Sequence, residues 1–341
     1  MRILYPEVQS VLSEILQQHQ FKREDAELCS RLFAETTRDG VYSHGLNRFP
    51  RFIRNIRNGY VKTGKEAVQV LAHHAHEVWD GQAGPGNLNA WKMMNRAMEL
   101  AKKYAVGMVS LKNTNHWMRG GTYGWQAAEA GYAAICTTNT EPNMPPWGGS
   151  EPIIGNNPLV IAMPDSPAHF VLDMAMSQFS FGKMEDYHLQ DKVLPYPGGY
   201  DQNGELTNAP GEILKTRQPL PVGYWKGSGL SIMLDLLVSV LSGGNATLDI
   251  GELPAEHAVS QLFIVFNLEI AGPNNHANSI MQKLKTEFLQ SKPFSDTSRI
   301  YYPGERTLRT RSESLKKGLL VNEEVWKTIL SLSTNNNNHQ H

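Results

Sequence analysis

The sequence predicts a mixed α/β fold in which a helical domain, built from both chain ends, flanks an α/β domain. Three observations predict it. Apolar residues recur at helical spacing over residues 5–60, helix-like and strand-like runs alternate through the middle of the chain, and helical spacing returns after about residue 271. We therefore expect a discontinuous helical domain from residues 1–70 and 271–332, an α/β domain over residues 71–270, and a disordered polar tail at residues 333–341.

The N-terminal segment predicts three helices. The first carries an apolar stripe formed by Val8, Val11, Leu12, Ile15 and Leu16. A second helix follows with Ala26, Cys29, Leu32 and Phe33 on one face, and Gly40 is expected to end it. Ser43 is expected to cap a third helix, in which Pro50 either introduces a kink or starts a separate helix.

The middle of the chain predicts strands that alternate with helices. Residues 68–80 favour a strand pair or a strand and turn. The runs that follow predict a helix at 91–107, a strand at 106–113, a helix and then a strand within 123–139, two strands at 158–164 and 169–176, a helix at 228–244 and a late strand at 260–268. The helix at 228–244 has the clearest apolar stripe, and Gly243-Gly244 is expected to end it; the stripe comprises Leu230, Met233, Leu234, Leu237, Val238 and Leu241.

Composition excludes several classes of function. The chain has 341 residues, a formal charge of −1 and a mean hydropathy of −0.39, typical of a globular protein without a basic surface for nucleic acid. No apolar run approaches the ~20 residues needed to span a membrane, and the N-terminus lacks the apolar stretch of a signal peptide. Two cysteines, Cys29 and Cys136, form no disulfide framework, so we expect a cytoplasmic protein with reduced thiols.

The common nucleotide and hydrolase motifs are absent from the sequence. No Gly-x-Gly-x-x-Gly follows a strand, because the run GPGNLN at 84–89 fails at its last position. There is also no P-loop and no Gly-x-Ser-x-Gly turn. These absences argue against a Rossmann dehydrogenase and against an α/β-hydrolase.

His44 and Arg48 form the first candidate site. Residues four apart share one face of a helix, so the predicted third helix would present an imidazole and a guanidinium together. Such a pair suits an anionic carbonyl substrate, since arginine binds a carboxylate with two hydrogen bonds and histidine transfers a proton. The alternative is an ordinary surface helix.

His116 and Arg119 form a second candidate, in the loop after the strand predicted at 106–113. Loops at strand ends often carry functional groups. The alternative is a histidine whose hydrogen bonds are satisfied within its own turn.

A third group, His73, His74 and His76, lacks the further ligands that zinc requires, so we expect a solvated strand edge and no metal site.

Two further segments suit a nucleotide. Lys226 lies beside glycines at the start of the helix predicted at 228–244, where exposed amide groups favour phosphate. Asp173 ends a predicted strand and is suited to a ribose hydroxyl. The alternatives are an ordinary Gly/Ser helix start and a carboxylate that caps a turn. The nearest acidic residue to His44 in the sequence is Asp39, and nothing in the sequence assigns it as the partner of that histidine.

A set of short segments, in this order, resembles the malate/L-lactate dehydrogenase type-2 family of nicotinamide-dependent oxidoreductases, whose fold is unrelated to that of the Rossmann dehydrogenases. The segments span residues 40–306 and read SHGLNRF, NHWMRGG, PPWGG, IGNNPLVIAMP, VLDMAMS with FGK after it, WKGSGLSIMLDLL and PGE. The extended run from His116 to Gly121 and the Trp225-Lys226 pair are most similar to a branch that reduces 2,3-diketo-L-gulonate.

The resemblance implies a reductase that transfers hydride from NADH, or alternatively NADPH, to the keto carbon of a 2-oxo acid. It implies His44 as general acid, Arg48 as the group that holds the carboxylate, and His116 as a contact to the substrate oxygens. It also implies a homodimer. The cofactor is expected along His169, Phe170, Val171, Leu172, Asp173, Met174 and Ala175, and at Trp225, Lys226, Gly304, Glu305 and Arg306.

Two alternatives stay open at this point. Within the family, the substrate could instead be malate, L-lactate, ureidoglycolate or a cyclic imino acid, which substrate profiling separates. From another class, a binding protein that kept the fold and lost catalysis predicts cofactor binding without turnover.

Overall fold

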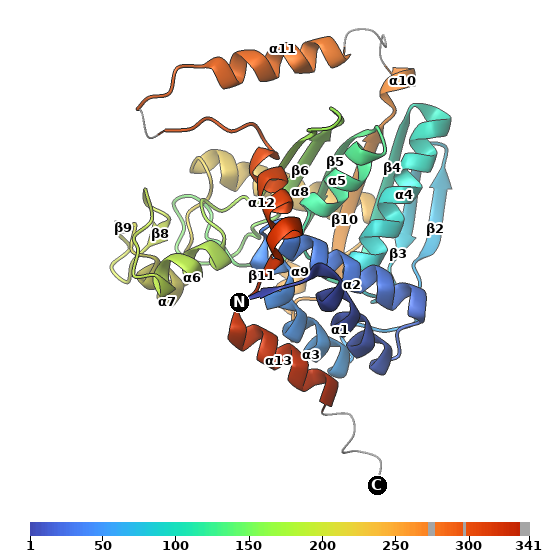
Figure 1. Cartoon of the computed structure of the whole chain (residues 1–341), viewed down its shortest axis with the longest axis horizontal. Coiled ribbons are helices and arrows are strands. Elements are labelled where there is room, and N and C mark those ends of the chain that lie inside the picture. The colour runs from blue at the N-terminus through green and yellow to red at the C-terminus, as the bar shows by residue number, and fades with distance from the viewer. Residues whose placement is uncertain (272–276, 296–297, 335–341) are drawn as a thin grey trace.

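The computed structural model describes residues 1–271, 277–295 and 298–334. Its main sheet has seven strands in the order β2-β3-β4-β10-β5-β6-β7 (Figure 1). Among these strands only β3 and β4 run parallel, and every other neighbouring pair is antiparallel. The strands are β2 (Val68–His73), β3 (His76–Asp80), β4 (Val106–Thr114), β10 (Val259–Phe266), β5 (Ala133–Thr138), β6 (Leu159–Met163) and β7 (Phe170–Met174).

This mixed sheet confirms the predicted α/β class and differs from the parallel sheet of a Rossmann domain. The late strand predicted at 260–268 is the central strand β10. Phe263 of β10 is fully buried and lies opposite Val109 of β4 and Cys136 of β5. The continuous apolar run over residues 262–266 of β10 is typical of a strand that is covered on both faces.

Helices cover the two faces of the sheet. The helices α4 (Gly86–Tyr104) and α5 (Gly121–Glu129) contact each other and one face, whereas α8 (Trp225–Ser242) packs against β10, β4 and β5 from the other side (Figure 1). The core between α4, α5 and the sheet contains Met94, Leu111, Trp117, Tyr123 and Phe263.

The helix α8 confirms the element predicted at 228–244, but most of its large apolar side chains are exposed instead of buried. It ends at Gly243, whose φ of 63° is the left-handed conformation of a glycine C-cap. Most of the buried residues of α8 are small: Gly227, Ser228, Ser231, Ser239 and Ser242, with Leu234 and Val238. The predicted stripe is divided, because Leu234 and Val238 are buried, Leu241 is half-buried, and its other members lie on an exposed apolar face that comprises Leu230, Ile232, Met233, Leu236, Leu237 and Val240.

The two chain ends meet in a layer of helices. Strand β1 (Arg2–Ile3) pairs with β11 (Leu319–Leu320), and α1 contacts α13 (Figure 1). The helices of this layer are α1 (Tyr5–Gln18), α2 (Arg23–Arg38), α3 (Phe49–Arg57), α12 (Glu305–Lys317) and α13 (Glu323–Thr334). A second core, with Leu12, Phe33, Phe49 and Ile329 at its centre, joins α1, α2, α3 and α13.

Two sequence expectations concern the ends of this layer. The helices α11 (Ala277–Gln290), α12 and α13 confirm the return of helix after about residue 271, and the short helix α10 (Leu268–Ala271) ends at that residue. Ser333 and Thr334 of the expected tail are the last residues of α13, and residues 335–341 lie outside the described residues. The division into two domains stays a prediction; its boundary at 70/71 falls within β2.

In the segment from residue 42 to residue 57 we predicted a helix capped by Ser43, with Pro50 either kinking it or starting a separate helix. Two turns of 3₁₀ helix, Tyr42–His44 and Leu46–Arg48, precede α3. Ser43 caps no helix, and Pro50 occupies the first turn of α3, so the alternative in which the proline starts a separate helix is the correct one. The break falls at Gly45, where a Cβ atom would lie 2.2 Å from Thr37 Oγ1 of α2.

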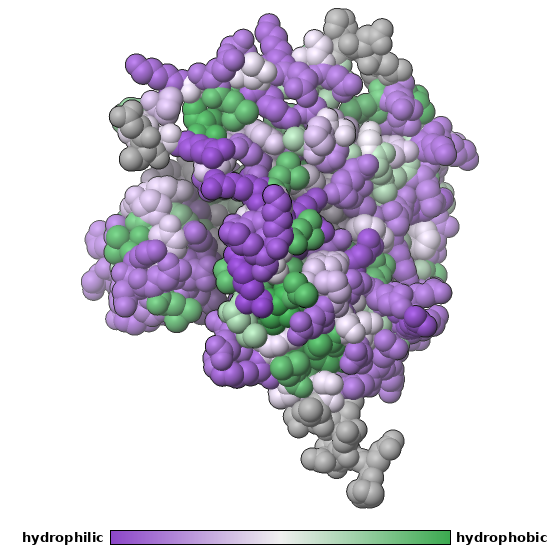
Figure 2. Space-filling view, in the orientation of Figure 1, coloured by the Kyte–Doolittle hydropathy of each residue, from purple (hydrophilic) through white to green (hydrophobic). Residues whose placement is uncertain are grey.

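A small lobe that the sequence did not predict follows β7. It contains α6 (Phe181–Leu189), α7 (Pro210–Thr216) and a hairpin of β8 (Gly199–Tyr200) and β9 (Leu206–Thr207). Its own apolar cluster contains Met184, Leu194 and Ile213. Figure 1 shows this lobe at the side of the molecule. Hydrophilic residues cover most of the face in Figure 2. Across the described residues, no helix is both long and apolar enough to cross a membrane.

The strand pair at 68–80 is confirmed as the hairpin β2–β3. His73 pairs with His76, and His74 lies in the turn with a φ of 51°. Among the described residues, no three histidine, cysteine, aspartate or glutamate side chains are grouped as metal ligands would be.

Candidate active site

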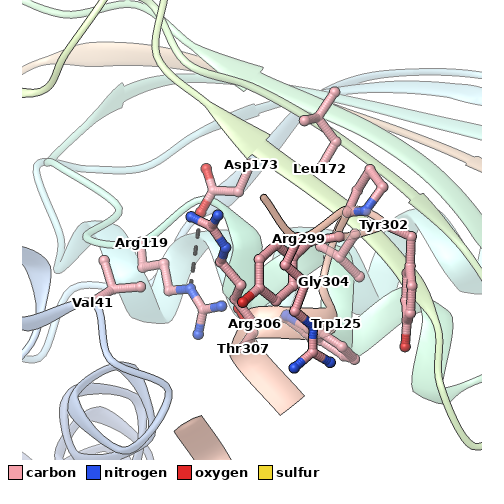
Figure 3. Close-up of a pocket in the computed structure, with 13 residues that line it drawn as sticks. Val41, Arg119, Trp125, Leu172, Asp173, Arg299, Tyr302, Gly304, Arg306 and Thr307 are labelled. Carbon is pink, nitrogen blue, oxygen red and sulfur yellow. Dashed lines mark ion pairs between the residues drawn. The ribbon is translucent and has the colours of Figure 1, made fainter. Parts of the chain in front are cut away.

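Three neighbouring cavities share lining residues in series. The first, which we call the histidine cavity, has a volume of about 400 Å³ and is lined by His44, Arg48 and His116. The second, the connecting cavity, has about 240 Å³; it shares both histidines with the first and reaches Arg119 and Asp173. The third, the C-terminal cavity, has about 540 Å³ and shares Arg119 and Asp173 with the second (Figure 3).

The histidine cavity brings together the three residues predicted to be catalytic. They do not share a helix face as the i, i+4 spacing suggested, because the turn at Gly45 separates His44 from Arg48. Instead, two short 3₁₀ turns direct both side chains to the same cavity, and His116 enters from the loop after β4.

His44 is a neutral imidazole at pH 7 in this structure. Burial and the positive charges of Arg48 and Arg119 lower its pKa to about 4. Its Nδ1 atom lies 2.9 Å from Ser43 Oγ, and its ring stacks on that of His116 with 5.7 Å between the ring centres. No carboxylate within ion-pair distance of His44 is present among the described residues.

His116 has a defined tautomer. The backbone N–H of Met118, a residue with a φ of 68°, donates a hydrogen bond of 3.0 Å to its Nδ1 atom. Nδ1 is therefore unprotonated, and in the neutral ring the proton lies on Nε2. Burial, aided by Arg48, lowers the pKa of this ring well below its usual value. Both interpretations of the sequence hold in part, because a local turn occupies one ring nitrogen while the ring lines the cavity.

Arg48 is held by a carboxylate that the sequence analysis missed. Its Nη2 atom donates to Glu256 Oε2 at 3.1 Å, and Arg51 lies 3.9 Å from the same oxygen. Glu256 follows α9 (Thr247–Gly251), about 200 residues away in sequence. No short-range pattern connects such distant positions, so nothing in the sequence pointed to this pair.

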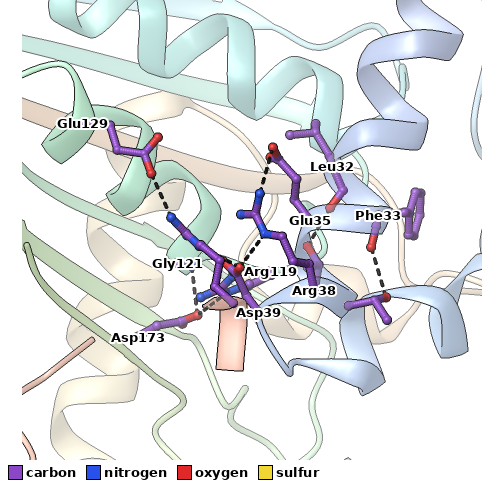
Figure 4. Close-up of polar contacts among 12 residues, drawn as sticks. Leu32, Phe33, Glu35, Arg38, Asp39, Arg119, Gly121, Glu129 and Asp173 are labelled. Atoms are coloured by element: carbon purple, nitrogen blue, oxygen red, sulfur yellow. Dashed lines mark hydrogen bonds and ion pairs between the residues drawn. The ribbon is translucent and has the colours of Figure 1, made fainter. Parts of the chain in front are cut away.

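Asp39 is not the partner of His44 and instead joins three arginines (Figure 4). Its Oδ1 accepts from Arg38 Nε and Arg311 Nε, both at 2.8 Å, and its Oδ2 accepts from Arg119 Nη1 and Arg311 Nη2, both at 2.7 Å. Burial alone would raise the pKa of Asp39, but the arginines hold it well below its usual range. These four hydrogen bonds connect the end of α2 and helix α12 to the loop that carries His116.

Arg119 links that network to the connecting cavity. Its side chain is only 4% exposed, and its Nε atom has no hydrogen-bond partner in the described part of the chain. This Nε lies 3.9 Å from Asp173 Oδ2, an oxygen that accepts a hydrogen bond from Gly121 N at 2.8 Å. Burial raises the pKa of Asp173, with Arg119 opposing. A buried donor without a partner, beside a carboxylate, is suited to a polar group of a ligand.

The structure brings together part of the predicted cofactor set. Val171, Leu172 and Asp173 line the C-terminal cavity with Gly304 and Arg306 (Figure 3). Ala175 lines the connecting cavity, again with Asp173. Tyr301, Tyr302 and Arg299 also line the C-terminal cavity and were missed by the sequence analysis.

The rest of the predicted set does not line these three cavities. His169 accepts a hydrogen bond from Asp165 N, Phe170 packs on Tyr302, and Met174 joins a separate apolar cluster. Glu305 pairs with Arg299 at 3.0 Å. Trp225 and Lys226 are exposed at the start of α8. Their role toward a cofactor stays a prediction.

With this geometry described, the chain can be compared with known proteins. A family model for malate/L-lactate dehydrogenase matches residues 3–330. The chain belongs to this family. It is therefore an oxidoreductase of 2-hydroxy and 2-oxo acids, and its family implies a nicotinamide cofactor.

The malate/L-lactate dehydrogenase family includes relatives that match this chain over nearly its full length. A 2,3-diketo-L-gulonate reductase of Salmonella paratyphi A is 42% identical over 333 residues, which cover 97% of this chain and 100% of that protein. The malate dehydrogenase of Pyrococcus horikoshii is 27% identical, with a TM-score of 0.89 over 98% of this chain and 95% of the other. The sulfolactate dehydrogenase of Methanocaldococcus jannaschii is 27% identical, with a TM-score of 0.88 over 98% and 97%.

Proposed function

We propose that this protein is an NADH-dependent reductase that converts 2,3-diketo-L-gulonate to 3-keto-L-gulonate. The observation that carries the proposal is the histidine cavity, in which two neutral imidazoles face an arginine. The 42% identity to proteins named for this reaction supports the same substrate. NADPH is the alternative cofactor.

Arg48 binds the substrate carboxylate. Its guanidinium presents a planar fork of donors, and Glu256 occupies only Nη2 among the described contacts. The cavity also contains Arg51 and Arg217, so three arginines accompany the three carboxylates Glu141, Glu185 and Glu256. With both histidines neutral, the net charge of these groups is 3 − 3 = 0, so the attraction for an anionic substrate is local to the donors of Arg48.

His116 polarises the keto group that is reduced. With Nδ1 occupied by the Met118 N–H, its Nε2–H is the donor left for a substrate oxygen. A neutral imidazole donates this hydrogen bond without transferring its proton, so His116 orients the carbonyl and stabilises the negative charge that develops on the oxygen.

His44 supplies the proton that this oxygen takes up. When the reduced nicotinamide is bound, it supplies the hydride. The pKa of His44 is about 4 in the ligand-free protein because it is buried and because Arg48 is positive. A substrate carboxylate at Arg48 offsets that charge and raises the pKa, so substrate binding is coupled to protonation of His44. In the reverse direction, the neutral ring acts as the base.

The cofactor occupies the C-terminal and connecting cavities. Asp173 is placed to accept a hydrogen bond from a ribose hydroxyl, and the exposed guanidinium of Arg306 suits a phosphate. The residues expected to hold it are Val171, Leu172, Asp173, Ala175, Gly304 and Arg306. Arg119 lines both cavities, and its Nε, which has no hydrogen-bond partner among the described residues, is also expected to contact the cofactor.

The protein acts as a homodimer that buries the exposed apolar face of α8. Its six large side chains, led by Val240 at 73% and Met233 at 54% exposed, are more apolar surface than one helix of a monomer normally presents to water. Trp225 and Tyr224 extend the same surface at the start of the helix. A second copy offers the matching face by two-fold symmetry.

Substrate profiling of the wild-type protein tests the proposed function. We expect oxidation of NADH with 2,3-diketo-L-gulonate at a kcat/KM at least tenfold above that with pyruvate or oxaloacetate, and slower turnover with NADPH. No turnover of any 2-oxo acid with either cofactor would contradict the proposal and favour the binding protein.

A further inference from the structure

One wall of the histidine cavity has no role in the reaction described above. It is formed by the segment between β5 and β6, which contributes Thr140, Glu141, Asn143 and Asn156. Thr140 Oγ1 and Asn143 Nδ2 donate to Asn156 Oδ1, at 3.3 and 2.9 Å. These hydrogen bonds make the wall a connected polar surface.

Two acceptors on this wall lack donors. Asn143 Oδ1 is buried and has no hydrogen-bond partner in the described part of the chain. The half-buried carboxylate of Glu141 forms no hydrogen bond and no ion pair with the described residues. Buried acceptors are normally satisfied, so Asn143 Oδ1 points to a ligand that brings an O–H or N–H group, and the Glu141 carboxylate on the same wall is a second acceptor for such groups.

The charges around Glu141 do not satisfy it either. Glu256 engages both Arg48 and Arg51, at 3.1 and 3.9 Å. Burial and the charge of Glu256 raise the pKa of Glu141 above its usual value, and Arg51, Arg217 and Arg48 offset this rise only in part. A further negative charge at this wall would meet the carboxylates of Glu141 and Glu256, whereas Arg48 provides a site for one anionic group.

A hydroxylated carbon chain fits these acceptors, whereas two smaller 2-oxo acids do not. The hydroxyl groups of a sugar acid donate hydrogen bonds to carboxylate and amide oxygens. The second carboxylate of oxaloacetate has no proton to donate at neutral pH and is repelled by Glu141. Pyruvate has no hydroxyl group, so it gains no hydrogen bond from either acceptor.

We infer that Glu141, together with Asn143, determines specificity by accepting hydrogen bonds from substrate hydroxyl groups and by repelling a second carboxylate. This inference rests on the proposed function, since it assumes that the histidine cavity binds the 2-oxo acid. It adds a reason why a member of this family would prefer a sugar acid to a dicarboxylic acid.

The test compares kcat/KM for 2,3-diketo-L-gulonate, oxaloacetate and pyruvate in the full-length wild type and in Glu141→Gln. The substitution keeps the shape and removes the charge. We expect the ratio of kcat/KM for diketogulonate to that for oxaloacetate to fall at least tenfold, through a gain with oxaloacetate and a loss with diketogulonate. Glu151→Gln, an exposed carboxylate in the same segment, is the matched control and should leave the ratio within twofold.

Asn143→Ala is the second variant, with circular dichroism as a check on folding. It should lower kcat/KM for diketogulonate at least tenfold while that for pyruvate stays within threefold, because pyruvate has no hydroxyl group for the missing acceptor. Turnover with unchanged ratios in both variants would overturn this inference and leave the proposed function standing. Absence of turnover with all three acids in the wild type would overturn both.

Discussion

Asp39 is predicted to be the most consequential charged residue outside the cavity for stability. Its carboxylate is 2% exposed and accepts four hydrogen bonds from three arginines. The substitution Asp39→Asn removes the negative charge and turns an amide toward three guanidinium groups. Breaking a buried ion pair from one side costs about 3–5 kcal/mol. With ~2.1 cal/mol/K of unfolding entropy per residue, 341 residues convert this cost to a fall of about 4–7 °C in Tm.

Differential scanning calorimetry at pH 7 measures this loss. The matched control is Glu27→Gln on the same helix, whose partner Arg23 is exposed, and we expect no measurable change in its Tm. Since the pKa of Asp39 is depressed in the folded state, its stabilisation is present above about pH 4 and is lost as the pH falls below that value. The gap in Tm between wild type and variant should therefore narrow at pH 3. A fall no larger than that of the control, or a gap unchanged at pH 3, would refute the reasoning.

Three more predictions follow from the cavity and from α8. The pH profile of kcat/KM reports the ionisation of the free enzyme, in which the pKa of His44 is about 4. Because His44 must be protonated to donate its proton, kcat/KM for reduction should fall about tenfold per pH unit from pH 5.5 to 8. A flat profile excludes His44 as the proton donor. Arg48→Lys should raise KM about 10–100-fold with a smaller change in kcat, as the planar fork of donors is lost, and an unchanged KM would place the carboxylate elsewhere. Leu236→Glu on α8 should convert a dimer to a monomer in analytical ultracentrifugation, whereas Leu189→Glu, at a more exposed leucine on α6, should not. A dimer that survives Leu236→Glu contradicts the proposed interface.

The helices and strands were largely predictable because their signals are local. Periodicity alone identified α1, α2, α4, β4 and β10, and the end of α8 at Gly243 followed from glycine's tolerance of positive φ. Which face of α8 is buried against the rest of the chain could not be predicted in this way. A stripe of large apolar residues indicates which side of a helix avoids water, but it does not distinguish a core from a second subunit.

The site was predictable only in part, for a related reason. His44, Arg48 and His116 lie in short motifs, and the structure brings them to one cavity although the helix-face argument for the first two was wrong. Glu256 and the wall around Glu141 come from distant segments with no motif of their own. Their proximity is created by the order of strands in the sheet, where β10 lies between β4 and β5. Spacing along the chain carries no information about that order.

The central claim is that His44 delivers a proton during reduction of 2,3-diketo-L-gulonate. The most direct measurement is the loss of NADH absorbance with this substrate, for the wild type and for His44→Ala, with thermal melting as a check that the variant is folded. We predict rapid turnover by the wild type and a loss of at least 100-fold in kcat for the variant, since general acid catalysis contributes roughly 10²–10⁴-fold. Turnover that persists at the wild-type rate in His44→Ala would contradict the mechanism, and a wild type that leaves NADH unchanged would contradict the function itself.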